Sequence, residues 1–179
     1  MSGLGERVTK LADRLYDRMR DPRAFTVARS EPAASDFTAL RGHKYALLVS
    51  FRRSGEPVPT PVWFGLDSAG ALYVRTEGAS GKAKRIRANH SVRIAPASAR
   101  GKPCGPLAAG TARVLPAEES ERAERALKSN YGLGRALYER TFGSAAADAV
   151  YLEVLPAGAG AGHDAAGEVA AGGEGGERA

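Results

Sequence analysis

A run of basic residues follows a glycine-rich turn between positions 76 and 87, where the sequence reads Thr-Glu-Gly-Ala-Ser-Gly-Lys-Ala-Lys-Arg-Ile-Arg. Ser80 is a natural N-cap, so we expect a helix to begin directly after it. Four cations, Lys82, Lys84, Arg85 and Arg87, would then occupy the first two turns, where the helix dipole disfavours each by about 0.3–1 kcal/mol. An anion bound at the exposed N–H groups would remove this conflict. The segment therefore predicts an anion site, and a phosphate ester is the best candidate.

Two other interpretations also fit a basic segment of this kind. A solvated basic helix needs no ligand at all, and the spacing of a Walker phosphate loop is absent. A nucleic-acid site would interleave exposed aromatic residues with the cations, but residues 75–93 contain no Phe, Tyr or Trp. We therefore expect a small anionic ligand rather than nucleic acid, with Gly78 and Gly81 allowing it to approach the backbone.

The chain's single tryptophan lies in a second notable segment, which reads Thr60, Pro61, Val62, Trp63 and Phe64. As a core aromatic of a small barrel, Trp63 needs no further explanation. The same strand, one hairpin away from the basic helix, could instead offer backbone groups and an aromatic wall to a planar ring. Such rings bind in mostly apolar clefts that carry a few placed polar groups. Both interpretations stay open at this point.

Charge is concentrated in the middle of the chain. Of the 179 residues, with a net charge of +6, positions 41–113 hold 13 basic and 3 acidic side chains, a local charge of +10. Such a block favours an anionic partner.

Catalytic and metal-binding residues are harder to find. Cys104 and three histidines offer no spacing typical of zinc, and Tyr45, Tyr73 and His90 are weak candidates for a proton donor. We assign no metal and no catalytic residue.

The elements that must position these residues are short strands. Apolar and alternating runs predict strands at 45–51, 58–64, 71–76, 92–95, 108–115 and 150–155, joined by tight turns. Prolines at 57, 59 and 61 place the second strand at an edge. Helices are expected at 6–20, ended by Asp21 and Pro22, at 82–89, at 118–130 and around 133–141, and Asp36 is expected to cap a short helical turn. The pattern predicts a mainly β (α+β) barrel with peripheral helices.

The domain organisation follows from composition. We expect an N-terminal helix and linker at 1–35, the barrel at 36–156, and a disordered tail at 157–179, which is built of Ala, Gly and Glu and holds 8 of the 22 glycines. The charged start of the chain lacks the apolar core of a secretory signal, and no apolar run is long enough to cross a bilayer. A cytoplasmic protein without a membrane partner is expected.

In order along the chain, these motifs resemble the split β-barrel superfamily of pyridoxamine 5′-phosphate oxidase-like proteins, and more narrowly its branch that uses the deazaflavin coenzyme F420. The resemblance spans roughly residues 36–155. Its most specific parts are the Thr-Pro-Val-Trp-Phe strand and the Ser-Gly-Lys-x-Lys-Arg turn into a helix. It implies a six-stranded antiparallel split barrel that forms a homodimer, with two cofactor clefts at the subunit interface.

The resemblance also implies a set of cofactor-binding residues. The phosphate and the start of the acidic tail of F420 would be held by the turn and helix start, and the ring would be lined by the tryptophan strand. The full set is Thr60, Pro61, Val62, Trp63, Thr76, Ser80, Gly81, Lys82, Lys84 and Arg85. Thr60 stands where the flavin-using oxidases carry an arginine that helps hold the flavin phosphate, and the C-terminal Arg/His substrate motif of those oxidases is missing. Both departures count against a pyridoxamine phosphate oxidase.

The leading functional expectation is therefore an F420-dependent reductase that transfers a hydride between reduced F420 and a small unsaturated or carbonyl-containing substrate. The cofactor would supply the organic chemistry and the protein its binding and orientation. An FMN-binding oxidase or reductase of the same fold is the first alternative, and a non-catalytic protein that binds F420 or a flavin is the second. The identity of the substrate does not follow from the sequence.

Overall fold

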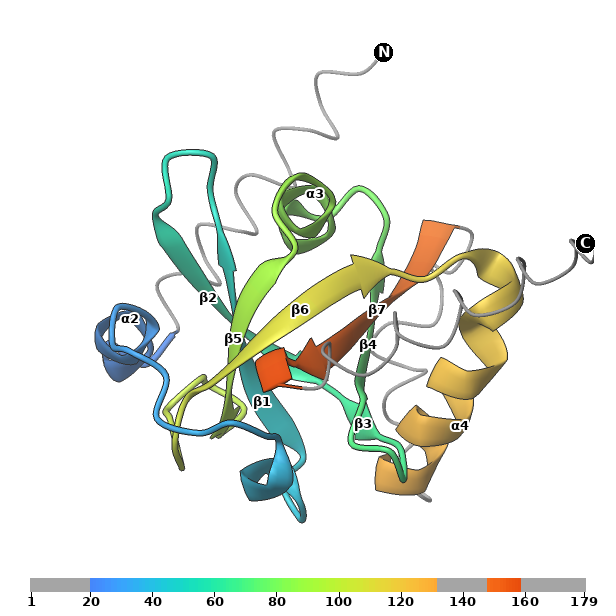
Figure 1. Cartoon of the computed structure of the whole chain (residues 1–179), viewed down its shortest axis with the longest axis horizontal. Helices are drawn as coiled ribbons and strands as arrows, with labels where there is room; N and C mark the ends of the chain where they lie inside the picture. The colour runs from blue at the N-terminus through green and yellow to red at the C-terminus, as the bar shows by residue number, and fades with distance from the viewer. Residues whose placement is uncertain (1–19, 132–147, 159–179) are drawn as a thin grey trace, which may run out of the picture.

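A computed structural model describes residues 20–131 and 148–158 of the chain. Within these ranges the protein is mainly β: one sheet of seven strands, in the order β2-β1-β5-β6-β7-β4-β3, curls into a half-barrel with a few helices around it (Figure 1). The strands are β1 Tyr45–Phe51, β2 Pro57–Trp63, β3 Gly65–Leu66, β4 Leu72–Glu77, β5 Ser91–Ala97, β6 Ala108–Val114 and β7 Ala149–Pro156. All pairings between named strands are antiparallel, as the tight turns predict.

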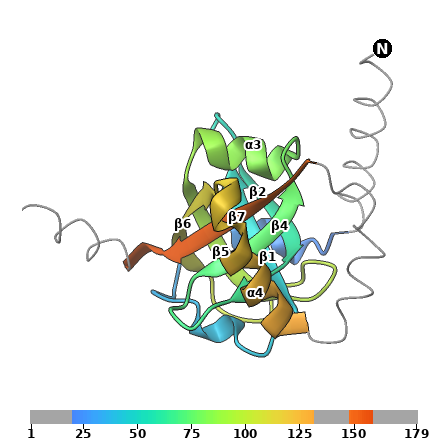
Figure 2. The ribbon, with the colours of Figure 1, turned by 90° about the vertical axis from the view of Figure 1, so that its right-hand side faces the viewer.

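The helices of the described ranges are α2 Arg23–Ala28, α3 Gly81–Ala88 and α4 Ser120–Tyr131, with 3-10 turns η1 Thr38–Leu40 and η2 Ala117–Glu119. Helix α3 lies across one end of the curled sheet in both views, while α2 and α4 flank its outer surface on opposite sides (Figures 1 and 2). Among these helices, none is long and apolar enough to cross a membrane.

The largest hydrophobic core fills the inside of the curl. It contains Leu48 of β1, Val62 of β2, Val74 of β4 and Ile86 of α3, all nearly inaccessible to solvent. Because side chains alternate along a strand, the neighbouring residues point to the outer surface. There Leu47 and other residues pack under α2, and Tyr73 lies in the cluster that contains α4 residues. The apolar face of each helix thus buries a different part of one sheet.

The edge position predicted for the proline-rich strand is confirmed. β2 is the first strand of the sheet and pairs only with β1, in a register that places Thr60 opposite Leu48 and Trp63 opposite Tyr45. A proline cannot donate to a strand partner, so an edge is where three prolines in seven residues are tolerated.

Two elements differ from the sequence-based expectation. The sheet has seven strands instead of the predicted six, because Gly65–Leu66 forms a two-residue strand against β4. Asp21 and Pro22 were expected only to end a helix, but α2 begins directly after them, and the Asp21 carboxylate accepts a hydrogen bond from the Arg23 N–H at 2.9 Å. Proline is compatible with a helix start because the first N–H groups have no partner within the helix. The predicted helices at 6–20 and 133–141 and the predicted tail lie outside the described residues, apart from Arg20 and positions 157–158.

Candidate functional site

The turn from β4 into α3 is built as the sequence predicts. The Ser80 side chain caps α3 by accepting a hydrogen bond from the Ala83 N–H at 3.4 Å. The hydroxyl groups of Thr76 and Ser80 lie 3.1 Å apart, which ties the end of β4 to the cap. The helix start is thereby fixed by two hydroxyl side chains, and both belong to the predicted binding set.

The cations are distributed differently from the sequence-based expectation. Because α3 ends at Ala88, Arg85 and Arg87 belong to its last turn, where the dipole favours positive charge. Arg87 donates from Nη1 to the Gly78 carbonyl at 2.7 Å and so fastens the turn that precedes the helix. Lys82 and Lys84 remain in the first turn, without an acidic residue there. The predicted conflict with the dipole therefore involves two cations rather than four.

Arg85 nevertheless reaches the helix start through its side chain. Its Nε donates to the Ser50 hydroxyl at 2.9 Å, and Ser50 is fully buried on β1. A Cβ added to Gly81 would lie 2.9 Å from Nη1 of Arg85, so the guanidinium occupies the space that a side chain at Gly81 would fill. The guanidinium is thus held between the buried end of β1 and the first turn of α3.

The side chains of the tryptophan strand point to both faces of the sheet. The Val62 side chain points into the main core. The Pro61 side chain lies on the outer side of the sheet together with that of Leu47, since a Cβ built at Gly101 would contact both of these side chains. Trp63 also faces outward, with its ring 5.3 Å from that of Tyr45 and 4.5 Å from that of Tyr131.

The register places the two ends of β2 at different distances from Ser50. Thr60 pairs with Leu48, two residues from Ser50, which is about 7 Å along the strand. Trp63 pairs with Tyr45, five residues from Ser50, which is about 17 Å. Thr60 is therefore close to the level of Arg85, whereas Trp63 belongs to an aromatic cluster at the opposite end of β2.

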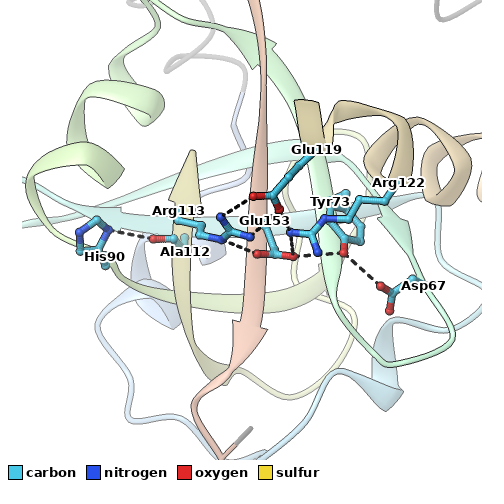
Figure 3. Close-up of polar contacts among 8 residues, drawn as sticks. All are labelled: Asp67, Tyr73, His90, Ala112, Arg113, Glu119, Arg122 and Glu153. Atoms are coloured by element: carbon cyan, nitrogen blue, oxygen red, sulfur yellow. Dashed lines mark hydrogen bonds and ion pairs between the residues drawn. The ribbon is translucent and has the colours of Figure 1, made fainter. Parts of the chain in front are cut away.

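A second polar cluster lies under α4 (Figure 3). The buried Glu153 of β7 accepts from Nε of Arg113 at 2.6 Å, pairs with Arg122 of α4 at 2.8 Å, and accepts from the Tyr73 hydroxyl at 3.2 Å. Glu119 contacts both arginines, at 2.8 Å to Arg113. These hydrogen bonds and ion pairs link β4, β6 and β7 to α4, and so hold the helix against the sheet.

The charge states of this cluster follow from its surroundings. Burial, followed by the nearby Asp67 carboxylate, raises the pKa of Tyr73 far above its ordinary value of 10, so the hydroxyl remains a donor at neutral pH. The hydrogen bond from Arg113 lowers the pKa of the Glu119 carboxyl, so that group remains charged. Tyr73 is only 1% exposed, which removes it as a proton donor to a ligand.

The other weak catalytic candidates have structural surroundings. The His90 ring lies 3.1 Å from the Ala112 carbonyl, and Ala112 returns a backbone hydrogen bond to His90. Tyr45 packs edge-on against Trp63. Cys104 is exposed in the loop after β5 and lies 3.3 Å from the Lys102 carbonyl. In the part of the chain that the structure describes, no three His, Cys, Asp or Glu side chains gather as a metal site would require.

Much of the central positive charge has structural partners. Arg93 donates from Nη1 to the carbonyls of Ala28 and Ser30 at the end of α2, and Arg52 pairs with Glu56 at 3.1 Å. Arg113 belongs to the cluster under α4. These three arginines of the central block therefore make structural contacts, and four further cations of the block lie on α3.

The sequence belongs to a known family. The family model described as pyridoxamine 5′-phosphate oxidase matches residues 31–156, more than half of the chain, so the protein is a member of this family. The sequence matches no curated protein. The split barrel implied by the sequence motifs is thus supported by the family match as well as by the curled sheet.

Solved structures share the fold at low sequence identity. A protein of unknown function from Agrobacterium tumefaciens is 19% identical with a TM-score of 0.51, and the match covers 74% of this chain and 53% of that one. A structure named F420 reductase is 19% identical with a TM-score of 0.48, covering 69% and 94%. The heme storage protein HutZ of Vibrio cholerae is 16% identical with a TM-score of 0.49, covering 65% and 83%. At these identities the likeness concerns the fold alone.

Sequence reasoning missed one residue of this site, Ser50. The signal was available, because Ser50 follows Ala46 and Leu48 at the alternating spacing that points into the core. A buried hydroxyl requires a hydrogen-bond partner, and a cation is the strongest one. The partner itself, Arg85, could not be identified without knowing that α3 covers this end of the sheet.

Proposed function

We propose that the protein is an F420-dependent oxidoreductase, which transfers a hydride between reduced F420 and a small unsaturated or carbonyl-containing substrate. The observation that carries the proposal is the Arg85 guanidinium, which lies over Gly81 at the capped start of α3. The first turn of α3 also holds Lys82 and Lys84 and contains no acidic residue. Membership of a family that contains oxidoreductases supports this class of chemistry, and the cationic helix start supports a phosphate-bearing cofactor.

The residues fit such a cofactor in several ways. The space beside the Gly81 backbone is taken by the Arg85 guanidinium, and the N–H groups of the first turn suit a phosphate together with the Ser80 and Thr76 hydroxyls. Lys82 and Arg85 would neutralise the phosphate, while the exposed Lys84 would meet the acidic tail. When bound, the deazaflavin supplies the hydride, and the protein contributes binding and orientation.

The placement of β2 refines the set of ring contacts that we propose. Backbone groups of Thr60, Pro61 and Val62 lie on an edge strand that a ring could approach. Among side chains, Thr60 is near the level of Arg85, and Trp63 is about 17 Å of strand away. We propose that a second copy of the chain completes the cleft at this edge, as the resemblance implies for a homodimer.

Two alternatives keep the same site. FMN carries a phosphate that the helix start would hold equally well, and the family's name refers to an oxidase. A protein that binds F420 or a flavin without catalysis is also compatible, since no described side chain is assigned as a proton donor. The absorption spectrum of the purified protein separates flavin from deazaflavin, and turnover with reduced F420 separates an enzyme from a carrier.

We expect Lys82→Ala to weaken F420 binding ~10–100-fold, because a charge-assisted hydrogen bond to phosphate contributes about 1.5–3 kcal/mol. The melting temperature should hardly change, since a cation in the first helical turn does not stabilise the helix. Fluorescence titration with F420 and FMN in parallel measures both affinities. Lys128→Ala, an exposed lysine of α4, is the control with the same change in charge and should bind as the unmodified protein does. Equal affinity of Lys82→Ala and the control would refute the assignment of the anion site.

A further inference from the structure

Ser50 is an unusual residue for the inside of this barrel. In the described ranges, 20–131 and 148–158, it is one of two buried polar or charged residues, the other being Glu153. Its neighbours on the same face of β1 are Ala46 and Leu48, both fully buried and apolar. Burying a hydroxyl among them costs free energy unless it is hydrogen-bonded. The bond it accepts comes from Arg85.

We propose that Ser50 and Gly81 together are positioning residues, which orient the Arg85 guanidinium so that the protein discriminates ligands by their phosphate. This inference rests on the proposed function and deepens it. Ser50 fixes one end of the guanidinium and Gly81 makes the space for the other. Neither residue needs to touch the cofactor, so both act through Arg85.

The geometry of the guanidinium supports this role. A guanidinium is planar, and its two terminal nitrogens lie on the side away from the chain, forming a fork that matches two phosphate oxygens. The Ser50 hydroxyl holds Nε at 2.9 Å, which restrains the plane from turning. Nη1 then lies over Gly81, 2.9 Å from where a Cβ would be. The helix geometry directs the fork toward the start of α3, and the bond to Ser50 holds it there.

The contact requires an arginine at position 85, a hydroxyl at position 50 and a glycine at position 81. Lysine at position 85 would keep the charge but has no Nε–H to donate and no plane to hold. Alanine at position 50 would leave the Arg85 Nε–H without the hydroxyl acceptor that it has in this structure. Alanine at position 81 would meet the far end of a flexible side chain, not backbone, so its cost to folding is small while the guanidinium must move.

The experiment compares ligands with and without a phosphate. Isothermal titration is carried out with F420 and its phosphate-free deazaflavin chromophore, and with FMN and riboflavin, on the unmodified protein, Ser50→Ala and Gly81→Ala. We expect both variants to lose roughly tenfold in affinity for the phosphate-bearing ligand, about one charge-assisted hydrogen bond, with unchanged affinity for the phosphate-free one. Ser129→Ala, which removes a hydroxyl that donates within α4, is the control and should change neither.

A double-mutant cycle tests whether Ser50 acts through Arg85. In the background of Arg85→Lys, Ser50→Ala should cause no further loss, because the contact is already gone. Additive losses, or a loss that is equal for phosphate-bearing and phosphate-free ligands, would overturn the inference. If Ser50→Ala fails to fold, Gly81→Ala decides the question alone.

The same titrations distinguish failure of this inference from failure of the proposed function. An unmodified protein that does not prefer F420 or FMN to the phosphate-free partner would overturn both. An unmodified protein that shows the preference, with Gly81→Ala retaining it in full, would overturn only the role of the positioning pair.

Discussion

Gly65→Ala is expected to destabilise the protein by about 3 kcal/mol, the upper end of what overpacking usually costs. A Cβ at Gly65 would overlap the main-chain atoms of Ala126 and Leu127, far inside the approach that real Cβ atoms make. A backbone cannot rotate away as a side chain can, so α4 would have to leave β3. For a chain of this size the melting temperature should fall by roughly 6–12 °C. Thermal unfolding followed by circular dichroism measures the change.

A second glycine provides the control for this variant. A Cβ at Gly158 would come no nearer than 4.0 Å to its closest neighbour. Gly158→Ala should therefore unfold at the same temperature as the unmodified protein. If Gly65→Ala behaves like this control, α4 does not pack on β3 as closely as the structure describes.

Glu153→Ala is expected to cost about 2–4 kcal/mol of folding free energy. The substitution removes the carboxylate that Arg113, Arg122 and the Tyr73 hydroxyl share at the buried centre of the cluster under α4. Breaking a fully buried ion pair costs about 3–5 kcal/mol. The range is set lower here because the side chains of Arg113 and Arg122 are 46% and 37% exposed and can recover some hydration.

Denaturant unfolding measures this effect against two related variants. Glu153→Gln keeps the size and one acceptor oxygen, so its loss should be smaller. Glu121→Ala removes an exposed partner of Arg125 on the same helix and should change stability by less than about 1 kcal/mol. Equal stability of Glu153→Ala and Glu121→Ala would show that the cluster contributes nothing to holding α4.

The strands were predictable because their signals are local. The apolar run of β1 was predicted at its observed bounds, and the prolines of β2 identified an edge. The strand Gly65–Leu66 was not predicted, since two residues are too few for alternation to show. Helix α2 was missed because the pair Asp21 and Pro22 ends one helical pattern and can equally begin the next.

The candidate site was predictable in its residue types but not in its geometry. Ser80 is the cap that the sequence indicates. The sequence analysis placed Arg85 at the anion site because its charge would conflict with the helix dipole. The structure shows no such conflict for Arg85, because its backbone is in the last turn of α3. Its side chain lies over Gly81 because helical side chains tilt toward the residue four positions earlier. The contact that holds Nε there comes from Ser50, on a strand 35 residues earlier in the chain. Such a contact depends on tertiary packing, which no local pattern contains.

The most direct test of the central claim is a crystal structure of the protein in complex with F420. We expect the phosphate to lie at the start of α3, within hydrogen-bonding distance of the Ser80 cap and of Lys82, with the Arg85 guanidinium still bonded to Ser50. A phosphate bound elsewhere on the protein, or a fully occupied cofactor whose phosphate makes no contact with α3, would contradict it.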